Sequence, residues 1–124
     1  HSLNNEKLDG GTERIVLKIP KILAPNKCAI LPLVKKDGLP EIATNLKDKL
    51  KLRYNVIYDE KDAIGKRYRR QDAIGTPYCI TIDHQTNEDK TVTIRDRDSM
   101  KQERVSVESI EGFLSKSFDI SNWL

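Results

Sequence analysis

The sequence predicts a mixed α/β domain in which one five-stranded sheet, containing three parallel strands plus antiparallel strands, is flanked by about three helices. Two observations carry this prediction. Strand-like and helix-like segments alternate twice before residue 83, and short polar connections then separate two further strand-like segments. Strand–helix–strand units place their strands parallel, whereas short connections join antiparallel neighbours. We therefore expect a three-stranded parallel core with two antiparallel strands added at one side.

Apolar runs identify the parallel strands. Residues 28–34 are apolar without alternation, which is typical of a strand buried on both faces, and Pro32 removes a backbone donor near its end. Residues 54–58 and 78–82 are the second and third strands. A short extended piece is expected before them, at residues 15–20.

Helical spacing and end signals place the helices. One stripe of apolar side chains predicts a helix over residues 39–50, made by Leu39, Ile42, Ala43, Leu46 and Leu50. A second helix fits residues 63–74 and is ended by Gly75, and a third fits roughly residues 109–118.

The remaining segments are polar or alternating. Residues 83–90 are expected to turn the chain, and residues 91–94 and 104–107 alternate as half-exposed strands do. Residues 1–14 are polar and contain Gly10-Gly11, so we interpret them as a flexible lead-in or linker before a domain at residues 15–124.

Length and composition favour one small domain. The chain has 124 residues, a formal charge of +3 and 37% hydrophobic residues. It has no apolar run of the roughly 18 residues that a membrane span needs, so we expect a soluble, cytoplasmic protein without membrane partners, and a mitochondrial form stays open. Because the sequence begins with His1-Ser2 rather than Met, we expect a piece of a longer chain.

Signatures of catalysis and metal binding are missing from the sequence. Cys28 and Cys79 lie in apolar runs without a Cys or His at metal-ligand spacing, and we interpret them as reduced core thiols. Gly65-Lys66 fails the phosphate-loop pattern, because Glu60 and Arg67 stand where Gly and Ser or Thr are required. We assign no catalytic residue, no metal site and no cofactor to this chain.

Positive charge is concentrated in two segments. Residues 61–72 hold five basic and two acidic side chains, and at about 100° per residue four of the cations fall on one helical arc: Lys66, Arg67, Arg69 and Arg70. Burying Ile64 and Tyr68 is expected to leave these cations together in solvent. We assign them, with Lys101 from the second segment (residues 90–104), to nucleic-acid phosphates; the alternative is an ordinary solvated basic face.

The second segment also contains an alternating motif, Arg95-Asp96-Arg97-Asp98, at the end of a predicted strand. On an extended backbone the two arginines point to one face and the two aspartates to the other. Arginine donates to phosphate, carbonyl and base acceptors, and aspartate accepts from the exocyclic amines of cytosine and adenine. The motif therefore suits the reading of single-stranded bases. The alternative is a charge-paired turn that caps a hairpin.

Several stretches resemble a known family. Residues 24–33, 63–68 and 71–77, and above all the Arg-Asp-Arg-Asp-Ser-Met string at 95–100, are similar to the C-terminal anticodon-binding domain of dimeric, class II glycyl-tRNA synthetases. The resemblance covers roughly residues 15–118. It implies the anticodon-binding fold shared by the glycyl, threonyl, prolyl and histidyl enzymes.

The resemblance also implies a function. In the parent enzyme, a glycine–tRNA ligase using ATP and Mg²⁺, the chemistry belongs to a preceding catalytic domain whose motifs this sequence lacks. The C-terminal domain binds the anticodon stem-loop of tRNA, and glycine anticodons carry cytosine at the second and third positions. The base-reading candidates are then Arg95, Asp96, Arg97, Asp98 and Asp83. We expect a monomeric fragment of a homodimeric parent.

Two other functions remain as alternatives. The same fold serves as an accessory or protein-interaction module, as in polymerase accessory subunits, which would bind nucleic acid without reading sequence. A small-molecule enzyme of the flavodoxin-like kind is disfavoured, because residues 32–36 after the first buried strand form no Gly-rich loop.

Overall fold

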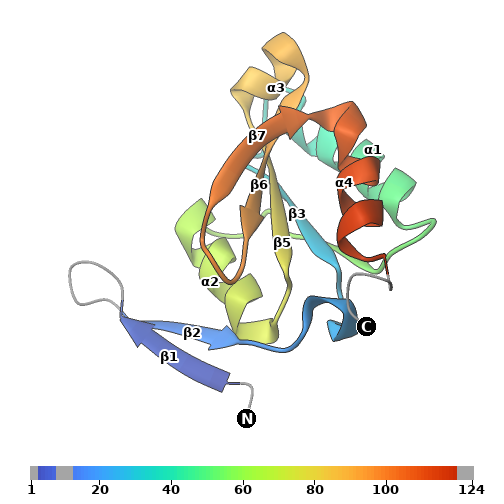
Figure 1. The fold of residues 1–124 in the computed structure, drawn as a ribbon. Coiled ribbons are helices and arrows are strands. Elements are labelled where there is room, and N and C mark those ends of the chain that lie inside the picture. Colours follow the sequence, from blue (N-terminus) through green and yellow to red (C-terminus); the bar gives the residue numbers. More distant parts are fainter. Residues whose placement is uncertain (1–2, 8–12, 120–124) are drawn as a thin grey trace.

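The computed structural model describes the backbone of residues 3–7 and 13–119 and the side chains of residues 15–119 (Figure 1). Its main sheet has five strands, in the order β4 (Val56–Tyr58), β3 (Cys28–Pro32), β5 (Tyr78–Ile82), β6 (Thr91–Asp96) and β7 (Gln102–Ser106). Strand β3 pairs in parallel with β4 and β5, and the β5–β6 and β6–β7 pairs are antiparallel. This confirms the predicted mixed sheet.

Helices cover both faces of the sheet (Figure 1). Helices α1 (Leu39–Leu50) and α4 (Ile110–Ser117) bury apolar side chains against one face, in a cluster that includes Ile30 and Ile80. Helix α2 (Ile64–Ile74) covers the other face. Among the described residues, no helix is long and apolar enough to cross a membrane.

The polar segment that was expected only to turn the chain contains a short helix, α3 (His84–Asp89). Asp83 caps it: its carboxylate accepts from the Thr86 N–H at 3.2 Å, and the Thr86 hydroxyl accepts from the Asp83 N–H at 3.1 Å. Such a reciprocal cap satisfies helix donors that would otherwise need water. The segment is therefore helical in spite of its polar composition.

A two-stranded hairpin precedes the main sheet. Strand β1 (Leu3–Lys7) pairs antiparallel with β2 (Glu13–Leu17), so residues 3–7 and 13–14 form strands within the segment that was expected to be a flexible lead-in or linker. Residues 1–2 and 8–12 lie outside the described residues, and the division of the chain at residue 15 stays a prediction.

The chain then runs along α2 to a 3-10 turn, η1 (Lys21–Leu23). We call residues 13–23, from β2 through η1, the arm. Gly75, at the end of α2, has φ +84°, and a Cβ there would lie 3.2 Å from the Leu17 carbonyl oxygen. Glycine thus provides both the left-handed backbone and the close approach of the arm to α2.

Candidate nucleic-acid interface

The structure corrects the expected position of Arg67. Its side chain is 1% exposed, and its guanidinium donates to three main-chain oxygens, those of Pro32 at 2.6 Å, Asp59 at 3.0 Å and Leu33 at 3.0 Å. The expectation of a solvent-exposed phosphate ligand was therefore wrong. Helix α2 lies across the carboxyl end of β3, and Arg67 supplies the donors that these carbonyls require once they are buried.

The other α2 cations remain at the surface but are not equivalent. Arg70 donates to Asp59 at 2.6 Å and to Asp62 at 2.7 Å, so its charge is largely neutralised. Lys66 and Arg69 are exposed. Of the four cations predicted to lie together in solvent, two are exposed, Arg70 is paired with carboxylates and Arg67 is buried.

Arg95 is the second buried arginine. It forms two bonds to Asp72 of α2, at 2.8 and 3.1 Å, and its guanidinium carbon lies 4.8 Å from the centre of the Tyr68 ring. Burial alone would lower the pKa of Arg95, but the hydrogen bonds and charge of Asp72 raise it. Arg95 is therefore buried and paired with Asp72, and a base could not reach its guanidinium.

Arg97 joins three parts of the structure. It is 2% exposed and donates to the Gly75 carbonyl at 2.9 Å, the Ile19 carbonyl at 2.7 Å and Asp98 at 2.8 Å. Arg95 and Arg97 thus point toward α2, as the predicted alternation requires. Asp98 departs from that pattern and pairs with Arg97, because β6 ends at Asp96 and the chain turns immediately afterward.

Asp96 lies on the opposite face from the two arginines. Its Oδ1 accepts from the backbone N–H groups of Asp98 at 2.8 Å and Ser99 at 3.2 Å, and its Oδ2 lies 2.5 Å from the Lys21 ammonium of the arm. Burial would raise the pKa of Asp96, but the Lys21 ammonium and these two N–H donors lower it. The carboxylate is therefore ionised and held in a fixed orientation.

The predicted base-reading residue Asp83 is not part of this cluster. It caps α3 after the carboxyl end of β5, whereas Asp96 pairs with Tyr78 at the opposite end of that strand. Arg104 donates to the Asp83 carboxylate. Burial would raise the pKa of Asp83, but the hydrogen bond and the charge of Arg104 lower it. The geometry gives Asp83 a structural partner far from Asp96.

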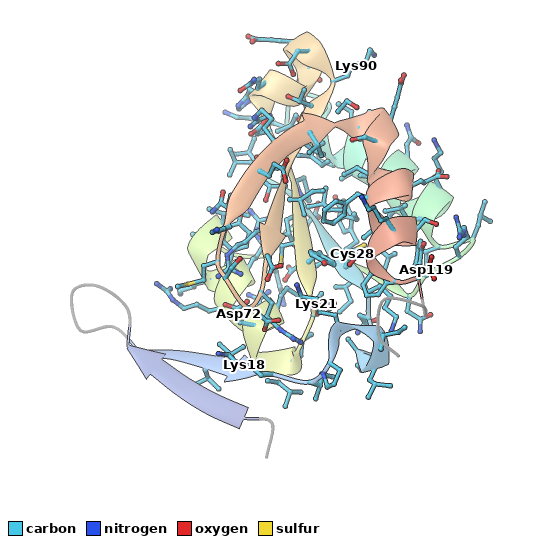
Figure 2. The ribbon with its side chains drawn as sticks, in the orientation of Figure 1. Lys18, Lys21, Cys28, Asp72, Lys90 and Asp119 are labelled. Carbon is cyan, nitrogen blue, oxygen red and sulfur yellow. The ribbon has the colours of Figure 1, made fainter. Side chains whose placement is uncertain are left out.

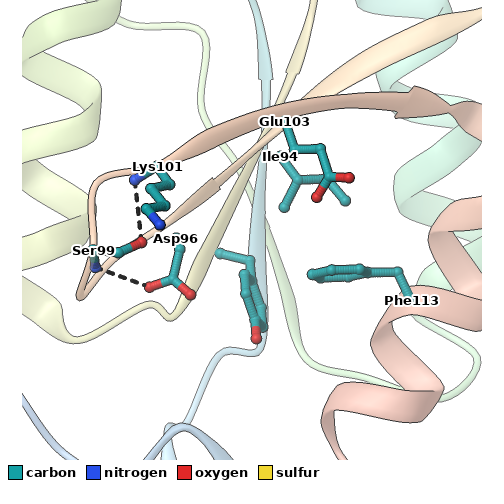
Figure 3. Close-up of a pocket in the computed structure, with 7 residues that line it drawn as sticks. Ile94, Asp96, Ser99, Lys101, Glu103 and Phe113 are labelled. Carbon is teal, nitrogen blue, oxygen red and sulfur yellow. Dashed lines mark hydrogen bonds between the residues drawn. The ribbon is translucent and has the colours of Figure 1, made fainter.

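A pocket of about 220 Å³ opens beside Asp96, between the β6–β7 turn and α4 (Figure 3). Its apolar surfaces come from Tyr78, Ile94 and Phe113, with the Tyr78 and Phe113 rings edge to face at 5.1 Å. Polar groups form its margin: Asp96, Ser99, Lys101 and Glu103. The pocket thus combines aromatic surface with hydrogen-bond donors and acceptors, which is the combination that single-stranded bases require.

The sequence reasoning identified Asp96 and Lys101 but missed Tyr78, Glu103 and Phe113. The strand pairing could have found two of them, since Tyr78 is opposite Asp96 and Glu103 is opposite Ile94 in the antiparallel ladders. Phe113 comes from α4 and carries no such signal. Among the described residues, no group of three or more His, Cys, Asp or Glu side chains could hold a metal ion.

Comparison with known proteins decides the family. The profile described as "Anticodon binding domain" matches residues 27–117. This chain belongs to the anticodon-binding domain family. Its fold agrees with the RNA binding domain of threonyl-tRNA synthetase from Cryptosporidium parvum Iowa II, with a TM-score of 0.71 and 24% identity over 80% of this chain and 25% of that one.

Curated relatives of this anticodon-binding domain are glycine–tRNA ligases. That of Clostridium acetobutylicum is 54% identical over 113 residues, which cover 91% of this chain and 24% of the relative. That of Rhodopirellula baltica is 57% identical over 97 residues, which cover 78% of this chain and 18% of the relative. The anticodon-binding domain thus spans at most about a quarter of the length of these two relatives. The arm lies before the profile match at residue 27.

Proposed function

We propose that this domain binds the anticodon stem-loop of glycine tRNA as part of a glycine–tRNA ligase. The observation that carries the proposal is the 54% identity to such a ligase over 91% of the chain. A catalytic domain outside these residues would attach glycine to tRNA with ATP and Mg²⁺, and it would be the second partner of this domain. The parent is proposed to be a cytoplasmic homodimer, and the fragment alone a monomer.

The pocket beside Asp96 is the proposed site for an unpaired anticodon base. Cytosine presents an amine that needs an acceptor, and the carboxylates of Asp96 and Glu103 both line the pocket. Tyr78 and Phe113 supply aromatic surface on which a base can pack. Asp96 is already ionised and oriented, so it accepts a base amine without a large ordering cost.

The two buried arginines of the motif at residues 95–98 take a different role in this proposal. Arg95 and Arg97 hold β6 and the following turn in place through Asp72, Gly75 and Ile19. They therefore position Asp96 rather than contact bases. Asp98 accepts a hydrogen bond from Arg97 and therefore also has a structural role in this proposal.

Phosphate contacts are assigned to the exposed cations. Lys101 lines the pocket, where a bound base would bring its own phosphate close. Lys66 and Arg69 are exposed on α2, on the other side of the sheet, and contribute attraction for the polyanion. Contacts of this kind set position and affinity, and base contacts set identity.

The test compares two anticodon stem-loops by fluorescence anisotropy at physiological salt. One carries a glycine anticodon, and the other has uracil in place of cytosine at the second anticodon position. We expect the first to bind the 124-residue chain about tenfold or more tightly, because one mismatched base contact costs roughly 1–3 kcal/mol. Equal affinities would overturn the proposal and favour an accessory module that binds without reading sequence.

A pair of variants locates the reading group. Asp96→Asn is expected to lose most of the preference, since an amide in place of the carboxylate disturbs both the Lys21 contact and the base acceptor. Asp48→Asn is the matched control, because Asp48 is 66% exposed on α1. If the Asp96→Asn variant kept the preference for cytosine over uracil, Asp96 would not be a residue that recognises the base.

A further inference from the structure

We propose that Lys21 of the arm is a specificity residue of the base pocket, donating a hydrogen bond to the ring acceptor next to the amine that Asp96 receives. This inference rests on the proposed function and extends it to a residue outside the family match, which begins at residue 27. It makes the arm a part of the binding site as well as the connection that precedes the domain.

Lys21 lies at the end of the sheet (Figure 2), where its ammonium is paired with the Asp96 carboxylate. The Lys21 ammonium lies 2.5 Å from Asp96 Oδ2 and 4.8 Å from the centre of the Tyr78 ring, which is a wall of the pocket. The side chains of Lys21 and Asp96 are 15% and 28% exposed, so both retain a surface on the solvent side. Lys21 is not among the residues that line the pocket, but it contacts Asp96 and Tyr78, which both line it, so a ligand that enters beside Tyr78 comes close to both charged groups.

The arm is held firmly on either side of Lys21. Arg97 donates to the Ile19 carbonyl at 2.7 Å, and Lys27 donates to the carbonyls of Ile22 at 2.7 Å and Ala24 at 2.6 Å. Lys21 itself is fixed by the ion pair with Asp96. A donor held in this way loses little conformational entropy when it binds, which favours a role in recognition.

The pair presents one donor next to one acceptor. Among the described residues, Asp96 Oδ2 accepts a bond from Lys21, and a carboxylate oxygen has two lone-pair sites. An ammonium has three N–H donors: the Asp96 bond uses one and the Tyr78 side chain engages a second, which leaves one for a ligand, and the Asp98 carboxylate lies farther away at 4.0 Å. Asp96 and Lys21 together therefore offer an acceptor in the pocket and a donor directly next to it.

Cytosine carries the complementary order, an amine donor at C4 beside an acceptor at N3. Uracil reverses it, with a carbonyl at C4 beside an N3–H. Uracil would place its C4 oxygen against the Asp96 carboxylate and its N3–H against the Lys21 ammonium, so both contacts become repulsive. The pair thus rejects uracil by two unfavourable contacts rather than by the loss of one.

The experiment removes each side of the proposed Lys21 contact in turn. Wild-type chain and the Lys21→Met variant are titrated with glycine stem-loops that carry either cytidine or 3-deazacytidine at the second or the third anticodon position. The analogue keeps the amine and lacks the N3 acceptor. We expect the analogue, at one of these positions, to bind wild-type protein about tenfold more weakly, as for a hydrogen bond to a charged donor. We expect Lys21→Met to bind both stem-loops with the same reduced affinity.

The matched control is Lys36→Met. Lys36 is exposed after the carboxyl end of β3, and Tyr78 begins the parallel strand β5, so the two lie at opposite ends of the sheet. This variant removes the same charge and is expected to keep the full tenfold sensitivity to the analogue. A structural role of Lys21 alone would lower affinity for both stem-loops and leave their ratio unchanged, which would overturn the inference.

The outcomes separate this inference from the function on which it rests. Wild-type protein that prefers cytosine to uracil but binds 3-deazacytidine as tightly as cytidine at both positions would overturn the role of Lys21 and leave the proposed function standing. This readout needs no variant, so it holds even if Lys21→Met folds poorly. Wild-type protein that shows no preference between cytosine and uracil would overturn both.

Discussion

Arg95 and Asp72 meet inside the domain as a two-bond ion pair, with Nη1–Oδ1 and Nη2–Oδ2 distances of 2.8 and 3.1 Å. Their side chains are 7% and 1% exposed. The pair joins β6 to α2 just before β6 ends at Asp96. A basic residue that sequence reasoning assigned to RNA therefore fixes the strand from which the pocket is built.

Removing one member of this pair is expected to be costly. Asp72→Ala should lower the free energy of unfolding by about 3–5 kcal/mol, because it leaves a buried guanidinium without its counter-charge. Urea denaturation followed by circular dichroism measures the change. Asp48→Ala, at an exposed position of α1, is expected to change stability by less than about 0.5 kcal/mol. Equal effects of the two substitutions would contradict the structural role of the pair.

Arg67 is expected to be a stability residue. Arg67→Met keeps much of the side-chain volume but removes the donors to three carbonyl oxygens, so we expect a loss of roughly 2–4 kcal/mol in the free energy of unfolding. The salt dependence of RNA binding by the folded fraction should not change. If Arg67→Met instead had normal stability and a smaller slope of log affinity against log salt concentration, Arg67 would be a phosphate contact.

The exposed cations of α2 are expected to show the opposite behaviour. Lys66→Met and Arg69→Met should each leave the free energy of unfolding within about 0.5 kcal/mol of wild type. Each should also lower the slope of log affinity against log salt by about 1 if it contacts a phosphate. Titrations of a stem-loop at several salt concentrations measure the slope. Unchanged slopes in both variants would show that α2 faces away from the bound RNA.

Asp83 is expected to contribute to acid stability. Its pKa in the folded state is lowered despite burial, mainly through Arg104, so as the pH falls the unfolded chain takes up the proton first. The stabilisation is therefore present above the unfolded-state pKa of about 4 and is lost as the pH falls toward the folded-state value.

Two substitutions at this position separate charge from capping. Asp83→Asn keeps a good N-cap but removes the charge, so its unfolding free energy should depend less on pH below about pH 4. Asp83→Ala also removes the cap and should cost about 1 kcal/mol more at neutral pH. Acid-unfolding curves of both variants make the comparison. Neither substitution should alter the preference for the glycine anticodon, because Asp83 and Asp96 lie at opposite ends of β5.

The five strands of the main sheet and the three longer helices could be predicted because their patterns depend on local spacing. Leu39, Ala43, Leu46 and Leu50 are all buried on one face of α1, as their spacing indicates. The buried face of α2 is different, since it carries Arg67, Gln71 and Asp72. Arg67 lies only about 60° around the helix from Ile64, so it stands at the border of the exposed arc. Apolar patterning cannot show that such a residue turns inward to meet buried carbonyls.

The site was harder to predict because its contacts join distant segments. Lys21 and Asp96 are 75 residues apart, and the ion pair forms only because the arm passes beneath the end of β6. The alternation predicted for residues 95–98 is confirmed for 95–97 and wrong at Asp98, which pairs with Arg97. Strand geometry also gives no information about which face is covered. Helix α2 covers the arginine face, so the motif presents Asp96 rather than Arg95 or Arg97 to the pocket.

The three-way attachment of Arg97 has a mechanical consequence. One guanidinium holds the Gly75 carbonyl at the end of α2 and the Ile19 carbonyl of the arm, and its own backbone belongs to the β6–β7 turn. A force applied through the β1–β2 hairpin would therefore act on the β6–β7 turn, which a flexible linker at this place would not allow. A displacement of β2 is thus passed through Arg97 to the turn that borders the pocket.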